Sequence, residues 1–418
     1  MNIYTYKNER LHIENISIEK ISKAIKTPFY CYSQTAIQQA YHSYSNNLQE
    51  LDVMICYAVK ANTNQSVIRV VADLGAGADV VSEGELRRAL QAGIPANKIV
   101  YSGVAKTESE LMFALKKDIF QFNVESENEL DLLNKLAVNC NKKAAIAFRI
   151  NPDVDADTHE KISTGKSENK FGIPIENARE IYQKAAKLLG IKIQGIDVHI
   201  GSQITKLAPF KKAFERIKLL VSELNNDGIN IPVIDVGGGL GVNYQQKNTI
   251  DYKIEDYCQM LVETFSDINC KILLEPGRSL VANSGLLVSK VVYKKQSKER
   301  VFLIIDAAMN DLLRPSMYNA YHDILSIKEK NEQTTYDVVG PVCETGDTFA
   351  RNRTMTSMNE GELLAIANVG AYGSVMASTY NTRLLIPEVL VKDEQYSIIK
   401  ARTNYDELIN LDRLASWQ

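Results

Sequence analysis

The sequence predicts an α/β protein with an added β domain: a (β/α)8 TIM barrel joined to a second, mostly antiparallel β-sandwich or barrel. Three observations lead to this prediction. Between about residues 50 and 280, short apolar runs alternate with amphipathic stretches of helical length. The apolar runs number eight, and a closed barrel of eight strands typically takes about 250 residues. After about residue 283 the helical stretches end, and apolar runs follow one another across gaps of turn length.

Each of the eight predicted barrel strands is a nearly continuous apolar run, which is typical of strands buried on both faces. They are 53–60, 78–82, 99–103, 119–124, 144–151, 193–201, 232–238 and 271–275. The predicted helices between them are 64–74, 83–92, 107–117, 126–138, 176–189, 208–226 and 251–266. Such alternation predicts parallel βα units. An open, doubly wound sheet is the alternative, and the number and total length of the units favour the barrel.

Two of these helices carry a start signal. Ser82 with Glu85, and Ser126 with Glu129, have the spacing of a capping box, in which a hydroxyl and a carboxylate satisfy amides at the helix start. We therefore expect helices to begin just after each serine.

The second domain is predicted to use residues from both ends of the chain. Its strand candidates are 286–294, 301–306, 335–340, 362–369, 387–392 and 396–401. The strand-like run Leu11-His12-Ile13 could pair with them, whereas residues 28–33 are expected to lead into the barrel. The predicted barrel, residues 27–282, is thus inserted into a β domain of residues 1–26 and 283–418.

Composition narrows the classes of function. The chain has 418 residues, with 48 basic and 51 acidic side chains and a formal net charge of −3. This balance does not favour nucleic acid or an anionic membrane surface as a partner. No apolar run approaches the roughly 18 residues of a membrane span, and the first residues lack the apolar core of a secretory signal. Six cysteines without CxxC pairs and five histidines without HExxH spacing predict no disulfide framework and no metal site, which fits a reducing cytoplasm.

Lys60 closes the first predicted strand, after the apolar run 53–59. A rigid strand end withdraws such an amine from water, and desolvation disfavours the ammonium, so we expect a lowered pKa. A neutral amine is a nucleophile that forms Schiff bases with aldehydes such as pyridoxal phosphate (PLP). Taken alone, a lysine here more often reaches toward solvent. The groups at the other strand ends favour the nucleophile.

Those groups stand at the carboxyl ends of the strands, where barrel enzymes keep their active residues. They are Asp79, the segment 149–151, His199, Ser202, the turn Gly237-Gly238-Gly239-Leu240-Gly241, and Glu275-Pro276-Gly277-Arg278. Glycine turns bring backbone amides close to an anion, and barrels often bind phosphate after strands seven and eight. The histidine could stack on a flat ring, and the glutamate could pair with a protonated pyridine nitrogen. Each group also has a plain structural role: a tight turn, a strand-end histidine, or an ion pair between Glu275 and Arg278.

Three segments of the predicted β domain are also dense in reactive groups. Cys343 stands beside Glu344 and could donate a proton, although free thiols are usually buried and inert. Arg314 could grip a carboxylate bidentately, or could lie at the surface before its proline. Tyr372 lies in a glycine-flanked turn and could equally be a core tyrosine. Their density suggests that the loops of this domain complete a site.

In order and spacing, these motifs resemble the fold-type III PLP-dependent decarboxylases, an alanine-racemase-like family. Within it they resemble the group that acts on diaminopimelate. The resemblance rests on residues 57–62, 199–203, 237–241, 275–278, 343–347 and 370–372, and covers almost the whole chain. Residues 158–172 are similar to the mobile loop of that group, and Arg314-Pro315 with Tyr318 also matches its pattern.

The resemblance implies a role for each candidate residue in a homodimer with shared active sites. Lys60 would bind PLP covalently, and Cys343 would donate the proton, entering together with Glu344 from the partner subunit. The other implied cofactor contacts are Asp79, His199, Ser202, Gly238, Gly239, Glu275, Gly277, Arg278 and Tyr372. The implied substrate contacts are Arg278, Arg314, Tyr318, Glu344 and Tyr372.

The implied reaction converts meso-diaminopimelate into L-lysine and CO2, the last step of lysine biosynthesis. A carboxylate at Glu275 favours decarboxylation over racemisation, because it keeps the pyridine nitrogen protonated and so deepens the electron sink. Arg278 and Arg314 could grip the distal carboxylate of this substrate. Three alternatives stay open: a decarboxylase of ornithine, arginine or carboxynorspermidine, a non-catalytic PLP-binding or regulatory protein, and a sugar-phosphate-binding barrel.

Overall fold

The structure is a computed structural model, and it describes residues 4–156, 165, 170–245, 250 and 252–418. The chain divides into two compact units. The barrel unit is Gln38–Asn243 with Asn248–Leu280, and the β unit is Met1–Ile37, Tyr244–Lys247 and Val281–Gln418. No helix in the described ranges combines the length and the apolar character that a membrane span requires.

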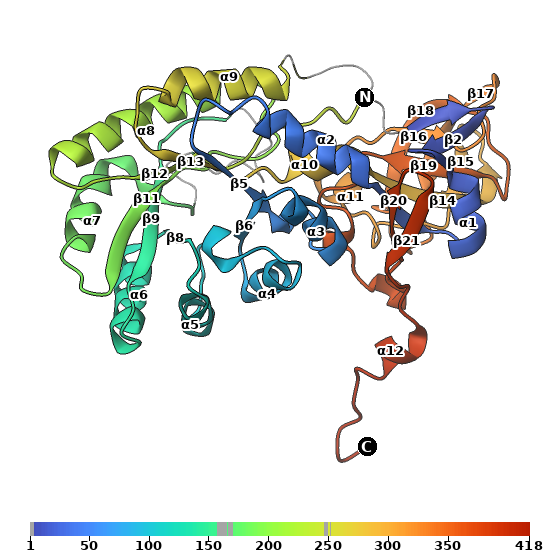
Figure 1. Ribbon diagram of the computed structural model, residues 1–418. Coiled ribbons are helices and arrows are strands. Elements are labelled where there is room, and N and C mark those ends of the chain that lie inside the picture. The colour runs from blue at the N-terminus through green and yellow to red at the C-terminus, as the bar shows by residue number, and fades with distance from the viewer. Residues whose placement is uncertain (1–3, 157–164, 166–169, 246–249, 251) are drawn as a thin grey trace. The chain divides into compact units, whose positions relative to one another are not determined.

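The barrel unit contains the predicted closed ring of eight parallel strands (Figure 1). The strands are β5 (Val53–Ala58), β6 (Gly77–Val80), β7 (Ile99–Tyr101), β8 (Gln121–Val124), β9 (Ala144–Asn151), β11 (Ile191–Asp197), β12 (Val233–Asp235) and β13 (Lys271–Leu274). Each pairs with its neighbours, and the pairing of β8 with β9 closes the ring. The short β10 (Ile173–Pro174) pairs with β9 outside it. The predicted fold class is therefore confirmed, and the open sheet is excluded.

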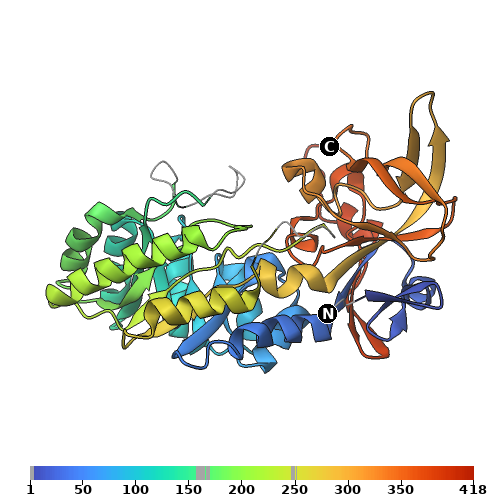
Figure 2. The same ribbon diagram turned by 90° about the horizontal axis from the view of Figure 1, so that it is seen from above.

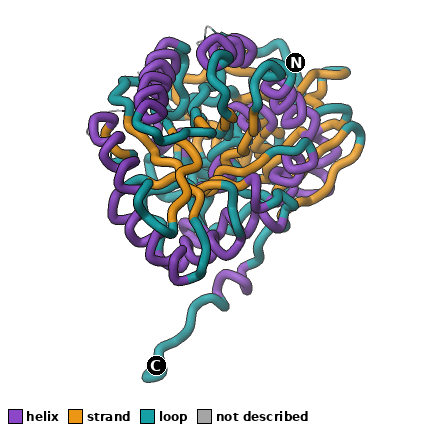
Figure 3. The backbone as a smooth tube through the Cα atoms, turned by 60° about the vertical axis from the view of Figure 1, so that its left-hand side comes forward, coloured by secondary structure: helices purple, strands orange, loops and turns teal. Residues whose placement is uncertain are grey.

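Helices follow the strands and surround them, as the end view in Figure 3 shows. They are α3 (Gln65–Asp73), α4 (Glu83–Gln91), α5 (Glu108–Lys117), α6 (Glu127–Asn139), α7 (Ala178–Ala185), α8 (Ala208–Asn226), α9 (Ile254–Phe265) and α10 (Arg278–Val281). α2 (Gln34–Ser45) precedes the first barrel strand. The long α8 and α9 lie side by side (Figure 2). Their facing sides are aromatic, with Phe210, Phe214 and Tyr257 in mutual ring contact.

The helix starts only half match the predicted capping boxes. Ser82 accepts the amide of Glu85 at 3.2 Å, but the Glu85 carboxylate accepts the amide of Val81 instead of that of Ser82. The start of α6 repeats this arrangement. Thr107 and Glu110 form a complete capping box, although none was predicted at that helix start.

The β unit is built on the long strand β14 (Gly285–Gln296), which pairs with three other strands. The sheet runs in the order β18 (Thr348–Thr356), β17 (Gln333–Val339), β15 (Val301–Ile305), β14, β4 (Phe29–Ser33), β20 (Glu388–Lys392), β21 (Gln395–Lys400), with β19 (Leu363–Ala367) and β16 (Ile324–Ser326) on a branch. All pairs are antiparallel except β15 with β17 and β4 with β20, so the predicted mostly antiparallel domain is confirmed. The sequence missed β16 and β18.

The start of the chain adds a small sheet and a helix to the β unit. β1 (Tyr4–Lys7), β2 (Arg10–Ile13) and β3 (Ile16–Ser17) form the sheet, and α1 (Ile18–Ile25) follows. The run 11–13, which was expected to pair with the β domain, lies in this small sheet. The amide of Leu11 donates to the carbonyl of Ile327, the residue after β16 of the larger sheet. Two short helices complete the unit, α11 (Arg314–Tyr318) and α12 (Tyr405–Ile409).

One segment lies elsewhere than expected. Residues 28–33 lead into the barrel along the chain, through α2, but they are not part of it: Phe29–Ser33 forms β4 between β14 and β20. All five of its side chains are buried. An apolar run reveals that a strand is buried but not which sheet buries it. The barrel unit accordingly begins at Gln38 and ends at Leu280, inside the predicted limits of 27 and 282.

Candidate active site

Lys60 lies at the carboxyl end of β5, but not in the strand itself. The ladder ends at Ala58, and Val59–Ala61 form a 3-10 turn that carries the lysine. Gly277 packs against this turn: a Cβ there would lie 3.0 Å from the Cβ of Ala58 and 3.1 Å from that of Ala61. A side chain at 277 would therefore push the turn outward, so a glycine at this position sets where the amine stands.

The amine of Lys60 pairs with a buried carboxylate. Its Nζ lies 2.6 Å from Oδ2 of Asp79, whose side chain is fully buried in β6. An opposite charge this close stabilises an ammonium. The lowered pKa expected for Lys60 therefore does not follow from its place at the strand end alone. The other oxygen of Asp79, Oδ1, is buried and has no hydrogen-bond partner among the described residues.

His199 follows β11 on the same rim. Burial, with the charges of Arg149 and Lys60, lowers its pKa well below the usual range, so the imidazole is neutral near pH 7. Its Nδ1 accepts the amide of Gly201 at 3.3 Å, which leaves the proton on Nε2. A neutral, flat ring fixed in this way is suited to stack on another aromatic ring.

The glycine turn is hydrogen-bonded to Glu275, the residue that follows the next strand, β13. The amide of Glu275 donates to the carbonyl of Gly237 at 2.8 Å. A Cβ at Gly238 would lie 2.2 Å from the carbonyl oxygen of Glu275, and Gly239 has a φ of +110°. Only glycine fits both constraints. The turn and the buried Glu275 carboxyl group therefore form one rigid unit at the rim.

Arg278 and Ser202 also meet at this rim. Nη2 of Arg278 donates to the hydroxyl of Ser202 at 3.0 Å, joining the start of α10 to the loop after β11. The guanidinium is almost entirely buried. The two residues that were expected to contact the same cofactor are thus in direct contact with each other.

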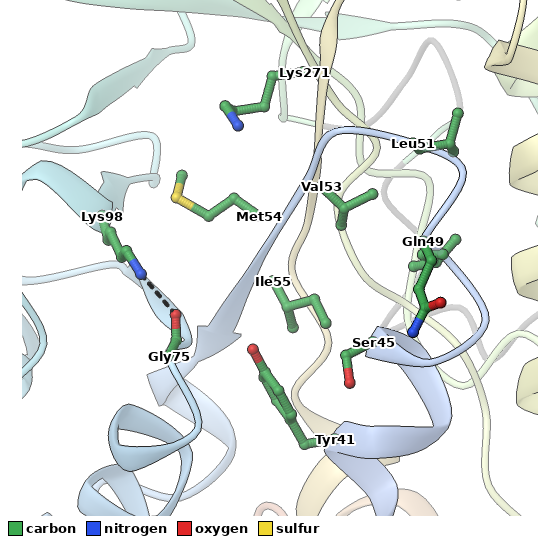
Figure 4. Close-up of a pocket in the computed structure, with 11 residues that line it drawn as sticks. Tyr41, Ser45, Gln49, Leu51, Val53, Met54, Ile55, Gly75, Lys98 and Lys271 are labelled. Carbon is green, nitrogen blue, oxygen red and sulfur yellow. Dashed lines mark hydrogen bonds between the residues drawn. The ribbon is translucent and has the colours of Figure 1, made fainter.

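A cavity elsewhere in the barrel unit does not belong to this group (Figure 4). It measures about 380 Å³ and lies between α2 and the first residues of β5, with Lys98 and Lys271 at its edge. Lys98 donates to the carbonyl of Gly75 at 2.9 Å. Because Lys60 follows the other end of β5, this cavity lies at the amino-terminal face of the barrel.

In the β unit, Cys343 and Glu344 lie in an exposed turn between β17 and β18. Asp347 organises this turn from a buried position, accepting the amides of Val342 and Met309 at 2.7 Å each. Burial raises the pKa of Asp347, and these amide hydrogen bonds oppose the rise. The Glu344 carboxylate accepts a hydrogen bond from Tyr380 and raises the pKa of its phenol. The hydrogen bonds of Asp347 therefore fix the turn that exposes the thiol of Cys343 and the carboxylate of Glu344.

Arg314 is held by two aromatic residues that the sequence analysis did not single out. Its Nη1 donates to Nε2 of His322 at 2.8 Å, and its guanidinium lies 4.3 Å from the ring centre of Tyr244. Arginine can only donate, so Nε2 accepts, and Nδ1 carries the hydrogen and donates a hydrogen bond to the carbonyl oxygen of Ala367. His322 is thus neutral, and it fixes the guanidinium of Arg314.

The two tyrosines predicted to contact the substrate, Tyr318 and Tyr372, differ in exposure and backbone conformation. Tyr318 ends α11 and is partly exposed. Tyr372 follows β19 in a left-handed conformation, with a φ of +54°. Such a backbone is costly for an aromatic residue and is found most often at functional sites.

Of the segment 158–172, only Gly165 and residues 170–172 are described, and Gly172 donates to the carboxylate of Glu125 at 3.1 Å.

Comparison with known proteins identifies the family. Residues 34–282 match the model of the pyridoxal-dependent decarboxylase, pyridoxal binding domain. The diaminopimelate decarboxylase of Zymomonas mobilis is 45% identical over 417 residues, which is 99% of each chain. The chain belongs to the diaminopimelate decarboxylase family. The enzyme of Aquifex aeolicus with this name is 43% identical over 97% of the chain and 96% of its own length.

Solved structures of the diaminopimelate decarboxylase family share the fold. The Helicobacter pylori enzyme, complexed with L-lysine, has a TM-score of 0.91 and 42% identity, covering 94% of this chain and 98% of its own. The M. jannaschii enzyme, also in complex with L-lysine, has a TM-score of 0.95 and 36% identity, covering 99% and 98%. Membership of this family makes the chain a PLP-dependent decarboxylase.

The rim residues of the barrel unit fit a pyridoxal group. An amine, a neutral imidazole, a buried carboxyl group and a glycine turn stand at the ends of neighbouring strands. They match the aldehyde, the flat ring, the pyridine nitrogen and the phosphate of the cofactor, respectively. The unpartnered Oδ1 of Asp79, beside the lysine, is a further polar atom that this group could satisfy.

Proposed function

We propose that this protein removes CO2 from meso-diaminopimelate to give L-lysine, and that Lys60 carries the cofactor. The observation that carries the proposal is the pairing of Lys60 with Asp79 on a rim shared with His199 and Glu275, in a chain of this family. Purified protein with PLP should release L-lysine from meso-diaminopimelate, with ornithine and arginine as substrate controls. Turnover of ornithine or arginine at a similar rate would instead indicate a broader or different decarboxylase.

PLP supplies an electron sink for the carbanion that loss of CO2 leaves behind. Toward that group, Glu275 would hold a proton at the pyridine nitrogen and His199 would cover one face of the ring. Gly238, Gly239 and Ser202 bind the phosphate, and Gly277 positions the turn of Lys60. Asp79 pairs with the amine of Lys60 and would lie beside the bound cofactor. Each role is supported by where its residue stands in the barrel unit.

The β unit contributes the substrate contacts and the acid. Arg314, with Arg278 from the barrel unit, binds the distal carboxylate, while Glu344 binds the distal ammonium by charge-assisted hydrogen bonds. Tyr318 and Tyr372 bound the substrate, and Cys343 delivers the proton that replaces CO2. The support for these roles is chemical: the turn of Cys343 is exposed and rigid, and the guanidinium of Arg314 is fixed on a neutral histidine.

Replacing Arg314 by alanine should raise KM for meso-diaminopimelate and lower kcat/KM by about 30- to 160-fold. This range corresponds to the loss of roughly 2–3 kcal/mol from a charged hydrogen-bonded contact. Arg314→Lys should recover only part of the loss, because an ammonium lacks the bidentate geometry. Steady-state kinetics measure both effects, and Arg351→Ala, an exposed change in β18, is the matched control. An unchanged kcat/KM in Arg314→Ala would remove this residue from the substrate site.

We further propose a cytoplasmic homodimer in which Cys343 and Glu344 of one subunit serve the Lys60 site of the other. Exposed apolar side chains after β21, Leu411, Leu414 and Trp417, support association of the chain with a partner.

Mixing two inactive variants tests the shared site. Lys60→Ala and Cys343→Ala should each be inactive as homodimers. Random exchange of subunits makes half of the dimers mixed, each with one intact site, so about a quarter of wild-type activity should return. Activity after co-expression, with the dimer mass measured by light scattering, gives the result. No recovery in a confirmed mixed dimer would mean that both residues act within one subunit.

A further inference from the structure

His322 contacts the guanidinium of Arg314 inside the β unit without being one of the proposed substrate contacts. The two residues are 1% and 6% exposed. Nε2 of the imidazole accepts from Nη1 of Arg314 at 2.8 Å, and Nδ1 donates to the carbonyl oxygen of Ala367, also at 2.8 Å. Because both ring nitrogens make hydrogen bonds within the unit, the imidazole is held in one orientation.

The backbone that carries this imidazole is held by two strands of the sheet. Nη1 of Arg353, on β18, donates to the carbonyl oxygen of His322 at 2.9 Å. The carbonyl of the next residue, Asp323, accepts the amide of Ala367 at 2.9 Å, directly before β16 begins at Ile324. Ala367 ends β19, which pairs with both β14 and β16. The sheet therefore sets the position of His322.

Tyr244 completes the support of the arginine. This tyrosine belongs to the β unit, although it follows the glycine turn of the barrel unit in sequence. Its ring centre lies 4.3 Å from Cζ of Arg314, which is a cation–π distance. The same ring centre lies 5.1 Å from that of His322, with 75° between the ring planes. Each of the three residues thus contacts the other two, and they form one packed group.

A guanidinium that is already fixed binds a carboxylate at a lower cost in entropy. An arginine side chain has many rotamers, and ordering them during binding weakens affinity. Here the histidine and the tyrosine order the side chain in advance. The acceptor is also neutral, so it holds the guanidinium without cancelling its charge, whereas a carboxylate at position 322 would compete with that of a substrate. The group therefore favours ligands with a carboxylate beside Arg314.

We propose that His322 is a positioning residue that makes the site selective for substrates with a distal carboxylate, by holding Arg314 in the conformation that binds this group. Tyr244 is the second support of the same arginine. The inference rests on the proposed contact between Arg314 and the distal carboxylate of meso-diaminopimelate. It adds that the selectivity depends on the histidine, and not only on the arginine that touches the substrate.

Two ligands that differ only in the carboxylate test this inference. L-lysine, the product, keeps the distal carboxylate, and cadaverine is L-lysine without it. Inhibition of the PLP-loaded enzyme gives one inhibition constant for each ligand. His322→Phe keeps a flat ring beside Tyr244 but removes the acceptor. This variant should raise the inhibition constant of L-lysine by about 3- to 30-fold, less than removal of the arginine itself, and leave that of cadaverine unchanged.

Further variants separate positioning from a general defect of structure. His322→Gln supplies an amide oxygen as acceptor and should recover part of the affinity for L-lysine. His12→Phe, the same change in β2 of the small sheet, is the matched control and should equal wild type with both ligands. In an Arg314→Ala enzyme, His322→Phe should weaken L-lysine no further, because the histidine acts through the arginine.

Equal weakening of L-lysine and cadaverine by His322→Phe would overturn the inference, because it would show a purely structural role. An unchanged constant for L-lysine, or a full additional loss in the double variant, would overturn it as well. If His322→Phe does not fold, Tyr244→Leu removes the ring beside the guanidinium and gives the same comparison. The proposed function fails in a different way: Arg314→Ala alone would then leave the affinity for L-lysine unchanged.

Discussion

Replacing Lys60 by alanine is expected to abolish decarboxylation, with kcat reduced by at least about 10⁴-fold, because the amine that is proposed to hold the cofactor covalently is removed. Absorbance of the bound cofactor that is sensitive to borohydride should be lost with it. Lys60→Arg separates the two roles of this side chain. A guanidinium keeps the charge beside Asp79 but cannot form the covalent bond, so this variant should fold like wild type and remain inactive.

A lysine at the other end of the barrel provides the control for that experiment. Lys98→Ala lies at the amino-terminal face and should retain wild-type kcat. An active Lys60→Arg enzyme would show that the ion pair with Asp79, and not covalent attachment, is what the reaction requires.

Replacing Cys343 by alanine is expected to lower kcat by about 10²- to 10⁴-fold, the contribution typical of a positioned general acid. The side chain is exposed and the turn is held by Asp347, so stability and the affinity for L-lysine should change little. Stopped-flow measurement of CO2 release and of L-lysine formation locates the defect. Loss of product formation with CO2 release retained is expected, since the thiol acts after the bond breaks.

The partly buried thiol of Cys270 is the matched control, and Cys270→Ala should behave as wild type. Burial raises the pKa of this thiol to about 11, so it is a poor acid near neutral pH. A Cys343→Ala enzyme with unchanged kcat would show that another group, or water, supplies the proton.

Much of the barrel could be predicted because strands buried on both faces leave a plain apolar signal. The predicted bounds of 144–151 and 208–226 match β9 and α8. The sequence also indicated which residues lie at the rim, because polar residues directly after a buried strand must lie at the end of the barrel. Lys60 shows the limit of this reasoning: its turn depends on Gly277, more than 200 residues later in the sequence.

The sequence did not indicate residues whose role depends on contacts with residues far away in the chain. His322 and Tyr244 fix Arg314, and neither has a local pattern that marks it. Asn123 did leave a signal, since it and Gln121 are polar residues within the apolar run 119–124. Polar side chains inside a doubly buried strand need partners in the barrel interior. These partners are the buried carboxyl groups of Asp235 and Glu275, which the amide of Asn123 contacts.

The placement of the β unit residues in the reaction rests on chemistry and family membership. The turn of Cys343 and the contacts of Arg314 are each rigid within their own unit. Tyr372, with its left-handed backbone, is a third residue of the β unit in this position. These are the positions at which kinetic measurements would add most to the structure.

Reductive trapping followed by peptide mapping tests the central claim most directly. The chain is incubated with PLP, reduced with borohydride, digested, and analysed by mass spectrometry. We predict one phosphopyridoxyl adduct per chain, on the peptide that contains Lys60. An adduct on another lysine, such as Lys98 or Lys106, or no adduct in protein that turns over meso-diaminopimelate, would contradict the account.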